Sequence, residues 1–300
     1  MVTPLWIAVD WGTTRLRVWA MGPDGPLEAR SSDKGMGGLD RDQFEDALTE
    51  LVGDWLPATG RLPVIACGMV GARTGWVEAE YRQTPCPPLD PQHATRPKVR
   101  DPRMDVMILP GLSQAAPPDV MRGEETQIAG FLAENPGFDG MLCLPGTHCK
   151  WVRLSGGKVI AFRTFMTGEV FSLLSRQSVL RLSMTDAQPD AASFAKAAAE
   201  ALANPNLAQT GLFAIRAGSL LTQTSPEANA GRLSGLLIGA ELAACRDFWQ
   251  DRPTVIIGAP QLSGLYERAL RDAGADARSA DGGMLALSGL TAAFHELETT

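Results

Sequence analysis

The same order of short segments occurs twice along this chain, and the repetition limits the possible folds more than any other feature. Each half contains three strand patterns, joined first by a turn with glycine and then by a hairpin turn. The strand patterns lie at residues 5–9, 16–19 and 27–31 in the first half and at 141–144, 148–154 and 158–164 in the second. A helix pattern follows each set, from about Asp40 and from about Gly168. The order predicts an α/β protein of two similar lobes with a cleft between them.

We place the boundary between the lobes at residues 135 and 136, which gives an N-terminal lobe of 1–135 and a C-terminal lobe of 136–300. Prolines are so frequent between Pro85 and Pro118 that we expect an extended excursion without regular helix. The C-terminal third alternates between helix patterns and one clear strand. The helix patterns lie at 191–203, 232–250, 262–273 and 283–297, and the strand lies at 254–257.

Charge and composition exclude several classes of protein. The 300 residues carry 27 basic and 34 acidic side chains, a net charge of −7, and no basic block that would bind nucleic acid. No segment approaches the roughly 20 apolar residues of a membrane helix, and the first residues do not resemble a signal peptide. The five cysteines contain no Cys-x-x-Cys pair, which argues against a disulfide framework or a zinc ribbon. We therefore expect a cytoplasmic protein, and the sequence leaves the choice between monomer and homodimer open.

Two glycine turns are candidates for holding phosphate groups. The first contains Asp10, Gly12, Thr13 and Thr14, where glycine lets backbone N–H groups approach a ligand and two hydroxyls add donors. The Asp10 carboxylate is also a candidate ligand for Mg²⁺, which usually keeps part of its water shell. The alternative is an ordinary β-hairpin.

The matching turn in the second half contains Gly146 and Thr147, followed by Lys150, a cation that could meet a phosphate. Two such turns would hold one polyphosphate from both sides. A third small-residue segment, around Gly258, follows the strand at 254–257 and is a candidate for contact with an adenine ring. A plain strand-to-helix connection is an equally good interpretation of that segment alone.

Residues in the first half suggest where a second substrate would bind. Glu124 and Arg122 precede an apolar helix, and a phosphoryl transfer needs a carboxylate to accept the hydroxyl proton and a cation to bind an anionic substrate. Acidic residues in a first helical turn are also favourable for the helix dipole alone. Two glycine clusters give further substrate candidates, which are Gly35, Met36, Met69, Arg73 and Trp76. Such loops could equally be simple connections.

Taken together, these blocks resemble the actin-like sugar-kinase fold, with its two ribonuclease H-like lobes, and within it the 2-dehydro-3-deoxygalactonokinase family. The resemblance rests on Asp10-Trp11-Gly12-Thr13-Thr14, Gly68-Met69-Val70-Gly71, Met121-Arg122-Gly123-Glu124-Glu125-Thr126-Gln127, Pro145-Gly146-Thr147-His148-Cys149-Lys150, Met166-Thr167-Gly168-Glu169 and Leu233-Ser234-Gly235-Leu236-Leu237-Ile238-Gly239-Ala240-Glu241. These blocks span nearly the whole chain. The chain departs from the superfamily in its second phosphate turn, where Pro145 precedes Gly146 and an aspartate is often found.

The resemblance implies phosphorylation of 2-dehydro-3-deoxy-D-galactonate at its C6 hydroxyl by ATP with Mg²⁺, a step in galactonate breakdown. It also implies that the C-terminal lobe binds the nucleotide and the N-terminal lobe the sugar acid. Two alternatives remain at this stage, which are a kinase for another sugar acid and a non-catalytic module that opens and closes with nucleotide. ADP release that depends on added sugar acid would distinguish either kinase from the non-catalytic module.

Overall fold

The computed structural model describes residues 2–184 and 188–299, which form two compact units. Unit 1 comprises residues 2–138, 155–160 and 282–299, and unit 2 comprises 139–154, 161–184 and 188–281. The first change of unit falls at Phe138, close to the boundary expected from the sequence. The C-terminal helix differs from the expectation, because it belongs to unit 1 and not to the second lobe. Its Leu287 and Leu290 share a buried cluster with Trp6 and Ala8 of the first sheet, so apolar burial holds it there.

The sheet of unit 1 has the strand order β3-β2-β1-β4-β6. Its strands are β1 (Trp6–Trp11), β2 (Leu16–Gly22), β3 (Gly25–Ser32), β4 (Leu62–Gly68) and β6 (Met104–Ile108). Strands β1, β2 and β3 pair antiparallel, and β1, β4 and β6 pair parallel. Apolar runs therefore form the centre of the sheet, as the sequence predicts.

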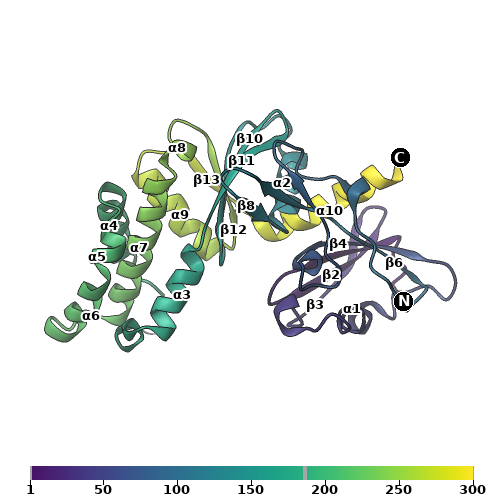
Figure 1. Cartoon of the computed structure of the whole chain (residues 1–300), viewed down its shortest axis with the longest axis horizontal. Helices are drawn as coiled ribbons and strands as arrows, with labels where there is room; N and C mark the ends of the chain where they lie inside the picture. Colours follow the sequence, from purple (N-terminus) through teal and green to yellow (C-terminus); the bar gives the residue numbers. More distant parts are fainter. Residues whose placement is uncertain (1, 185–187, 300) are drawn as a thin grey trace. The chain divides into compact units, whose positions relative to one another are not determined.

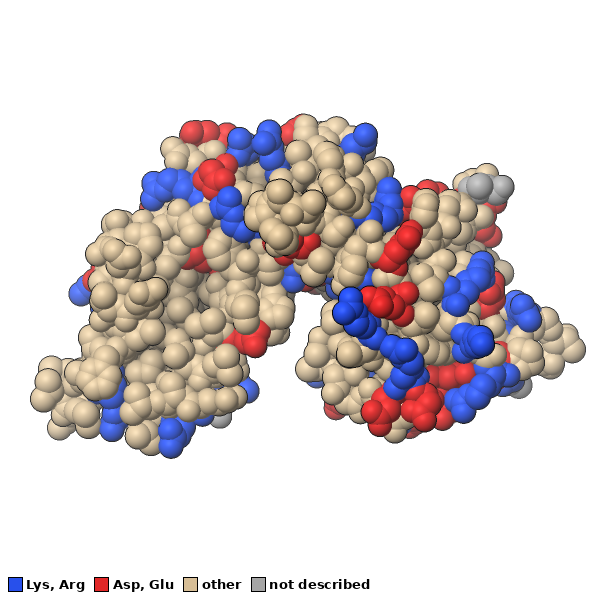
Figure 2. Space-filling model, in the orientation of Figure 1, with Lys and Arg blue, Asp and Glu red and all other residues tan. Residues whose placement is uncertain are grey.

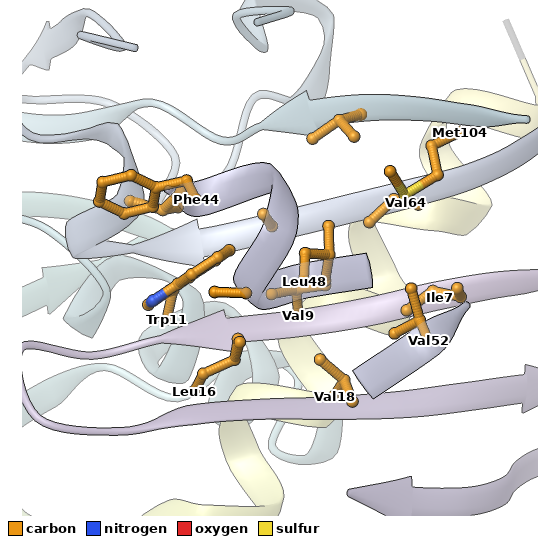
Figure 3. Close-up of a cluster of buried hydrophobic side chains, with 14 of the residues drawn as sticks. Ile7, Val9, Trp11, Leu16, Val18, Phe44, Leu48, Val52, Val64 and Met104 are labelled. Atoms are coloured by element: carbon orange, nitrogen blue, oxygen red, sulfur yellow. The ribbon is translucent and has the colours of Figure 1, made fainter. Parts of the chain in front are cut away.

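Each face of this sheet is covered by helix, which explains why the β1 side chains on both faces are buried, apart from that of the partly exposed Asp10. Helix α1 (Phe44–Val52) covers one face, where its Phe44 and Leu48 pack on Val9 and Trp11 (Figure 3). Helices α2 (Glu124–Glu134) and α10 (Gly282–Glu298) lie beside each other at the other face (Figure 1). The side chain of Gln43 accepts a hydrogen bond from the backbone N–H of Asp40 at 2.7 Å, but α1 begins only at Phe44 and not at Asp40.

The proline-rich excursion contains no α-helix in residues 85–118, all of which the structure describes. It contains β6, β7 (Gly111–Gln114) and one short 3-10 turn at Pro91–His93, and it ends just before β8 (Asp119–Met121). Strands β5 (Tyr81–Gln83), β7 and β8 form a small sheet in the order β5-β7-β8. The expectation of an extended excursion in the first unit is confirmed.

The sheet of unit 2 has the order β11-β10-β9-β12-β13, which repeats the order of unit 1. Its strands are β9 (Gly140–Leu144), β10 (Cys149–Ser155), β11 (Lys158–Phe165), β12 (Thr254–Gly258) and β13 (Ala277–Asp281). As in unit 1, the first strand pairs antiparallel with the second and parallel with the fourth. This repeat confirms the duplication read from the sequence. Strand β13 was not expected, because its sequence is polar.

Unit 2 is largely helical beyond its sheet. Its helices are α3 (Thr167–Gln177), α4 (Ala191–Ala203), α5 (Leu207–Thr210), α6 (Leu212–Leu221), α7 (Pro226–Ala244), α8 (Arg246–Trp249) and α9 (Pro260–Asp272). Helices α4 and α7 run side by side (Figure 1), in close contact because a Cβ on Gly235 would lie 2.4 Å from the Phe194 carbonyl oxygen. The single helix expected at 232–250 is two, α7 and α8, which meet at Cys245. None of the helices in the described part of the chain is long and apolar enough to cross a membrane.

Candidate active site

Asp10 stands near the end of β1 and keeps a partly accessible carboxylate. Its side chain is 16% exposed and forms an ion pair with Arg17, its neighbour on the antiparallel strand β2. On the other side, the Cys67 thiol of β4 lies 3.9 Å from Asp10 Oδ1. The carboxylate is therefore held by two neighbouring strands at the edge where β1 runs into the glycine turn.

The turn after Asp10 is braced by the glycine cluster that follows β3. Met36 N donates to Gly12 O at 3.0 Å, and Gly37 N donates to Thr13 O at 2.9 Å. The approach is so close that a Cβ on Gly35 would lie 2.3 Å from the Thr14 carbonyl carbon. The two sequence clusters thus form one assembly. Gly12 N donates to Arg15 O within the turn, whereas the side chains of Thr13 and Thr14 are exposed.

Two glycines bring the start of α2 to the end of β1. Gly68 has φ +89°, and a Cβ there would lie 2.7 Å from Trp11 O and 3.6 Å from Asp10 Oδ1. Gly123, with φ +104°, would place a Cβ 3.2 Å from the Cα of Gly68. Both conformations favour glycine, and no other residue would allow the two segments to approach so closely. The acidic start of α2 is therefore adjacent to Asp10 in unit 1.

The carboxyl groups of Glu124 and Glu125 differ sharply in environment. Glu124 is half-buried, and its Oε2 accepts the backbone N–H of Arg122 at 3.1 Å. Glu125 is fully buried and accepts the N–H of Gly123 through both oxygens, at 2.8 and 2.7 Å. Burial, with a smaller contribution from the negative charge of Glu124, raises the pKa of Glu125 to about 8. Glu125 was not identified from the sequence, because adjacent acidic residues at a helix start do not reveal which one is buried.

Arg122, the expected contact for an anionic substrate, is only 7% exposed. Its Nη2 donates to Ala79 O at 2.7 Å, and its guanidinium lies 4.2 Å from the centroid of the Tyr81 ring. Nη1 has no hydrogen-bond partner among the described residues and faces Gly71, where a Cβ would lie 2.8 Å away. The side chain therefore ties the start of α2 to the residues around β5.

The remaining substrate candidates divide into accessible and buried side chains. Arg73 is 86% exposed and pairs with Glu78 at 3.4 Å. Met36 and Met69 are half-buried in the short 3-10 turns that follow β3 and β4. Trp76 is only 8% exposed and lies in the core beside Trp11, so most of its ring cannot serve as a sugar platform.

Unit 2 contains a pocket of about 310 Å³ at its own glycine turn. Gly146 and Thr147 line it, as do Thr167 and Gly168 at the start of α3. The start of α3 is docked on the turn, because Glu169 N donates to Thr147 O at 2.9 Å and a Cβ on Gly168 would lie 2.2 Å from Gly146 O. The remaining wall is largely apolar and consists of Phe171, Pro189, Ser234, Leu237, Ile238, Leu262, Leu265 and Tyr266. An apolar pocket with a few polar groups at one end has the character of a site for a planar ring attached to a polar chain.

Two of the expected nucleotide contacts lie outside this pocket. Lys150 on β10 is only 6% exposed, so its ammonium group is enclosed by the protein. Gly258 ends β12, and a Cβ there would lie 3.2 Å from Pro145 O and 3.1 Å from the Ser263 Oγ. Gly258 therefore supports the Pro145–Gly146 turn from behind. The residues that sequence reasoning missed are the apolar ones on α7 and α9, whose spacing resembles that of ordinary core positions.

A buried acid supports the back of the same pocket. Glu241 on α7 is 3% exposed and accepts hydrogen bonds from Trp151 Nε1 at 2.7 Å and from the Tyr266 hydroxyl at 2.9 Å. Burial raises the pKa of this carboxyl above its usual value. Because Tyr266 itself lines the pocket, Glu241 fixes one of its walls. The glycine-rich segment at 235–241 serves close packing against α4, because a Cβ on Gly239 would lie 2.3 Å from the Ala198 carbonyl oxygen.

The residues around Asp10 fit a magnesium ion that takes few of its ligands from the protein. No group of three or more His, Cys, Asp or Glu side chains able to hold a metal occurs in residues 2–184 and 188–299. One accessible carboxylate suits an ion that is held mainly by water and substrate phosphates, which is the usual manner of Mg²⁺ in phosphoryl-transfer sites. The donor set of unit 1 is therefore compatible with Mg²⁺ carried by a nucleotide.

Proteins assigned to one family are similar to this sequence along nearly its whole length. The sequence model of the family described as 2-keto-3-deoxy-galactonokinase matches residues 10–293. A probable 2-dehydro-3-deoxygalactonokinase of Rhizobium meliloti is 40% identical over 293 residues, which cover 95% of each chain. The 2-dehydro-3-deoxygalactonokinase of Escherichia coli is 34% identical and covers 98% of this chain and 99% of its own.

Solved structures agree with these sequence matches. The crystal structure of a protein from Sinorhizobium meliloti, described as a 2-dehydro-3-deoxygalactonokinase, superposes with a TM-score of 0.90 at 38% identity and covers 97% of this chain and 99% of that one. The activator of 2-hydroxyisocaproyl-CoA dehydratase from Clostridium difficile shares the fold with a TM-score of 0.51 at 11% identity, over 98% of this chain and 97% of that one. The two α/β units thus have the actin-like fold expected from the sequence, and the chain belongs to the 2-keto-3-deoxy-galactonokinase family.

Proposed function

We propose that this protein transfers the γ-phosphoryl group of ATP to the C6 hydroxyl of 2-dehydro-3-deoxy-D-galactonate, which gives 2-dehydro-3-deoxy-6-phosphogalactonate and ADP. Membership of the family over residues 10–293 is the observation that carries the proposal. The grouping of Asp10 with the acidic start of α2 supplies carboxylates of the kind that this chemistry requires. The five cysteines are free and buried, which suits the reducing cytoplasm where ATP is available.

Each unit would contribute its own set of groups. In unit 2, the adenine would lie against the apolar wall of the pocket, with the first phosphates near Gly146 and Thr147. In unit 1, the hydroxyls of Thr13 and Thr14 would donate to phosphate oxygens, and Asp10 would hold Mg²⁺ through water or directly. Mg²⁺ supplies charge neutralisation on the phosphate oxygens when it is bound.

The transfer itself needs one proton acceptor. As the C6 oxygen forms its bond to the γ-phosphorus, the bond between that phosphorus and the β,γ-bridging oxygen breaks, and ADP leaves. The hydroxyl proton passes to Glu124, the more accessible of the two acids at the start of α2. Glu125, with its raised pKa, is protonated at neutral pH and holds the Gly123 backbone in place. Arg73, with its exposed side chain, is the residue we assign to the substrate carboxylate.

Release of ADP with a panel of acceptors tests this function. The panel contains 2-dehydro-3-deoxy-D-galactonate, its C4 epimer, D-galactonate and a reaction without sugar acid. We expect the first compound to give a kcat/KM at least roughly tenfold above the others, since pockets that hydrogen-bond a hydroxyl discriminate by that much or more. ADP release that is the same with and without sugar acid would identify a nucleotide-gated module instead.

A matched pair of variants ties the activity to the site. Asp10→Asn should abolish transfer while the circular dichroism spectrum stays unchanged. Asp33→Asn, a change of the same chemistry on a side chain that is 94% exposed, should keep the wild-type rate. Near-normal turnover by Asp10→Asn would remove Asp10 from the mechanism.

A further inference from the structure

A second cavity, of about 580 Å³, opens on the α1 side of unit 1. Its walls come from the segment before α1, from the loop after β4 and from the chain that leads into β6. The side chains that matter most to its chemistry are Arg41, Trp76, Arg96, Pro97, Lys98 and Arg100. Its volume lies within the range of small-molecule sites. The proposed kinase reaction makes no use of this cavity.

The lining of the cavity is strongly basic in a chain whose net charge is −7. Four cationic side chains line it, against the two acids Asp42 and Glu45. Glu45 is 6% exposed and is already satisfied, because its carboxylate accepts the N–H groups of Arg100 and Asp101 at 2.7 to 2.9 Å. It also pairs with the Arg100 side chain at 3.1 Å, so its charge is compensated within the wall and does little to repel an anionic ligand. Figure 2 shows that acidic and basic side chains also mix over the surface of this unit.

The cations differ in how far they are committed to other partners. Arg96 pairs with Asp105, and Arg100 pairs with Asp46 at 2.6 Å. Arg41 donates to the carbonyl oxygens of Gly75 and Arg73, so its guanidinium is fixed by neutral groups and keeps its charge available. Lys98 is exposed and has no ion pair among the described residues. Among the residues that the structure describes, Arg41 and Lys98 thus have no acidic ion-pair partner, unlike Arg96 and Arg100.

Apolar residues form the other part of the wall. Trp76 is held against Phe44, with ring centroids 6.5 Å apart, and Pro97 cannot change its φ angle. A ligand would meet these groups in the positions that they already occupy, so little conformational entropy would be lost on binding. The cavity thus combines fixed donors with a small rigid apolar edge, to which Trp76, at 8% exposed, contributes little area.

The sheet separates this cavity from Asp10. Successive side chains of a strand point to opposite faces, and those of Val9 and Trp11 lie in the cluster with Phe44 on the α1 side (Figure 3). The Asp10 carboxylate lies beside Cys67, whose side chain belongs to the cluster formed with α10 on the other face. A ligand in the cavity would therefore be on the opposite face of the sheet from the Asp10 carboxylate.

From this arrangement we propose that the α1 face carries a second binding site, for a small metabolite with two oxyanion groups, separate from the Asp10 centre. Arg41 and Lys98, which come from different segments of the wall, would each bind one carboxylate or phosphate of the ligand. A phosphorylated sugar acid has this chemistry. The inference does not depend on turnover, since it concerns binding alone.

Isothermal titration calorimetry tests the site with three probes in phosphate-free buffer. They are 2-dehydro-3-deoxy-6-phosphogalactonate with both groups, 2-dehydro-3-deoxy-D-galactonate with only a carboxylate, and inorganic phosphate. We expect the first to bind in two events, one of which Lys98→Glu weakens at least tenfold. Arg61→Glu makes the same change of charge on an exposed residue of unit 1 outside the cavity and should alter that event less than twofold.

The outcomes separate this inference from the proposed reaction. Identical titrations for the wild type and Lys98→Glu, or an equal loss with Arg61→Glu, would overturn the site. If the unphosphorylated sugar acid binds equally tightly at the site that depends on Lys98, the requirement for two oxyanion groups is overturned. If no acceptor in the panel is phosphorylated but the Lys98-dependent event persists, the proposed reaction fails and the second site stands.

Discussion

Burial of Glu125 predicts an unusual dependence of stability on pH. The carboxyl has a pKa of about 8 in the folded protein against 4.5 in the unfolded chain, because burial disfavours its charged form. Between these values the folded state keeps the proton and the unfolded state loses it. The contribution of Glu125 to stability is therefore fully present below pH 4.5 and is lost as the pH rises through 8. The free energy of unfolding should fall by about 1.4 kcal/mol for each pH unit, on the order of 4 kcal/mol between pH 5 and 8.

Urea unfolding of the wild type and of Glu125→Gln at several pH values isolates this effect, because glutamine accepts the Gly123 hydrogen bond but does not titrate. Tryptophan fluorescence is a suitable probe, since five of the seven tryptophans lie in unit 1. The stability of the wild type relative to the variant should decrease steadily from pH 5 to pH 8. Glu50→Gln, an exposed change on α1, should keep the wild-type slope. A difference between wild type and Glu125→Gln that stays constant over this range would refute the reasoning.

Two further predictions concern unit 2. Gly168→Ala should raise the KM for ATP by roughly tenfold, because the new Cβ would meet Gly146 O at 2.2 Å and overpacking of this kind typically costs 1–3 kcal/mol. Gly264→Ala, on α9 with open space around it, is the control in the same kinetic assay. An unchanged KM in both variants would exclude the pocket as the nucleotide site. Glu241→Ala should destabilise the protein by about 2–5 kcal/mol in thermal unfolding, since it leaves Trp151 Nε1 and the Tyr266 hydroxyl buried without an acceptor. Glu241→Gln should lose less stability. Equal melting temperatures for the wild type and Glu241→Ala would contradict the assignment.

Most strands of the two five-stranded sheets could be predicted from the sequence, because local signals determine them. Short apolar runs and turns rich in glycine mark β1 to β3 and β9 to β12, and the same order of segments in both halves reveals the duplication. Strand β13 escaped because an edge strand with the sequence Ala-Arg-Ser-Ala-Asp has no apolar run. Helix α10 was expected as a helix, but only its packing with Trp6 and Ala8 assigns it to unit 1. Long-range packing of this kind leaves no local signal.

The candidate site shows the same limit. Sequence motifs located both glycine turns and the acidic start of α2, since each depends on residue types at fixed spacing. Burial depends on the whole fold, so the sequence could not show that Lys150, Arg122 and Trp76 are enclosed while Arg73 is exposed. The roles of the individual site residues remain predictions that the variants above test.

The fate of the γ-phosphoryl group is the most direct test of the account. Phosphorus-31 NMR of the protein with ATP, Mg²⁺ and 2-dehydro-3-deoxy-D-galactonate follows that group without a coupling enzyme. We predict a new phosphomonoester signal, split by the two protons of a CH₂ group as expected for phosphate on C6, that grows in equal amount with ADP. Inorganic phosphate as the only new product, or a phosphomonoester coupled to a single CH proton, would contradict the proposed reaction.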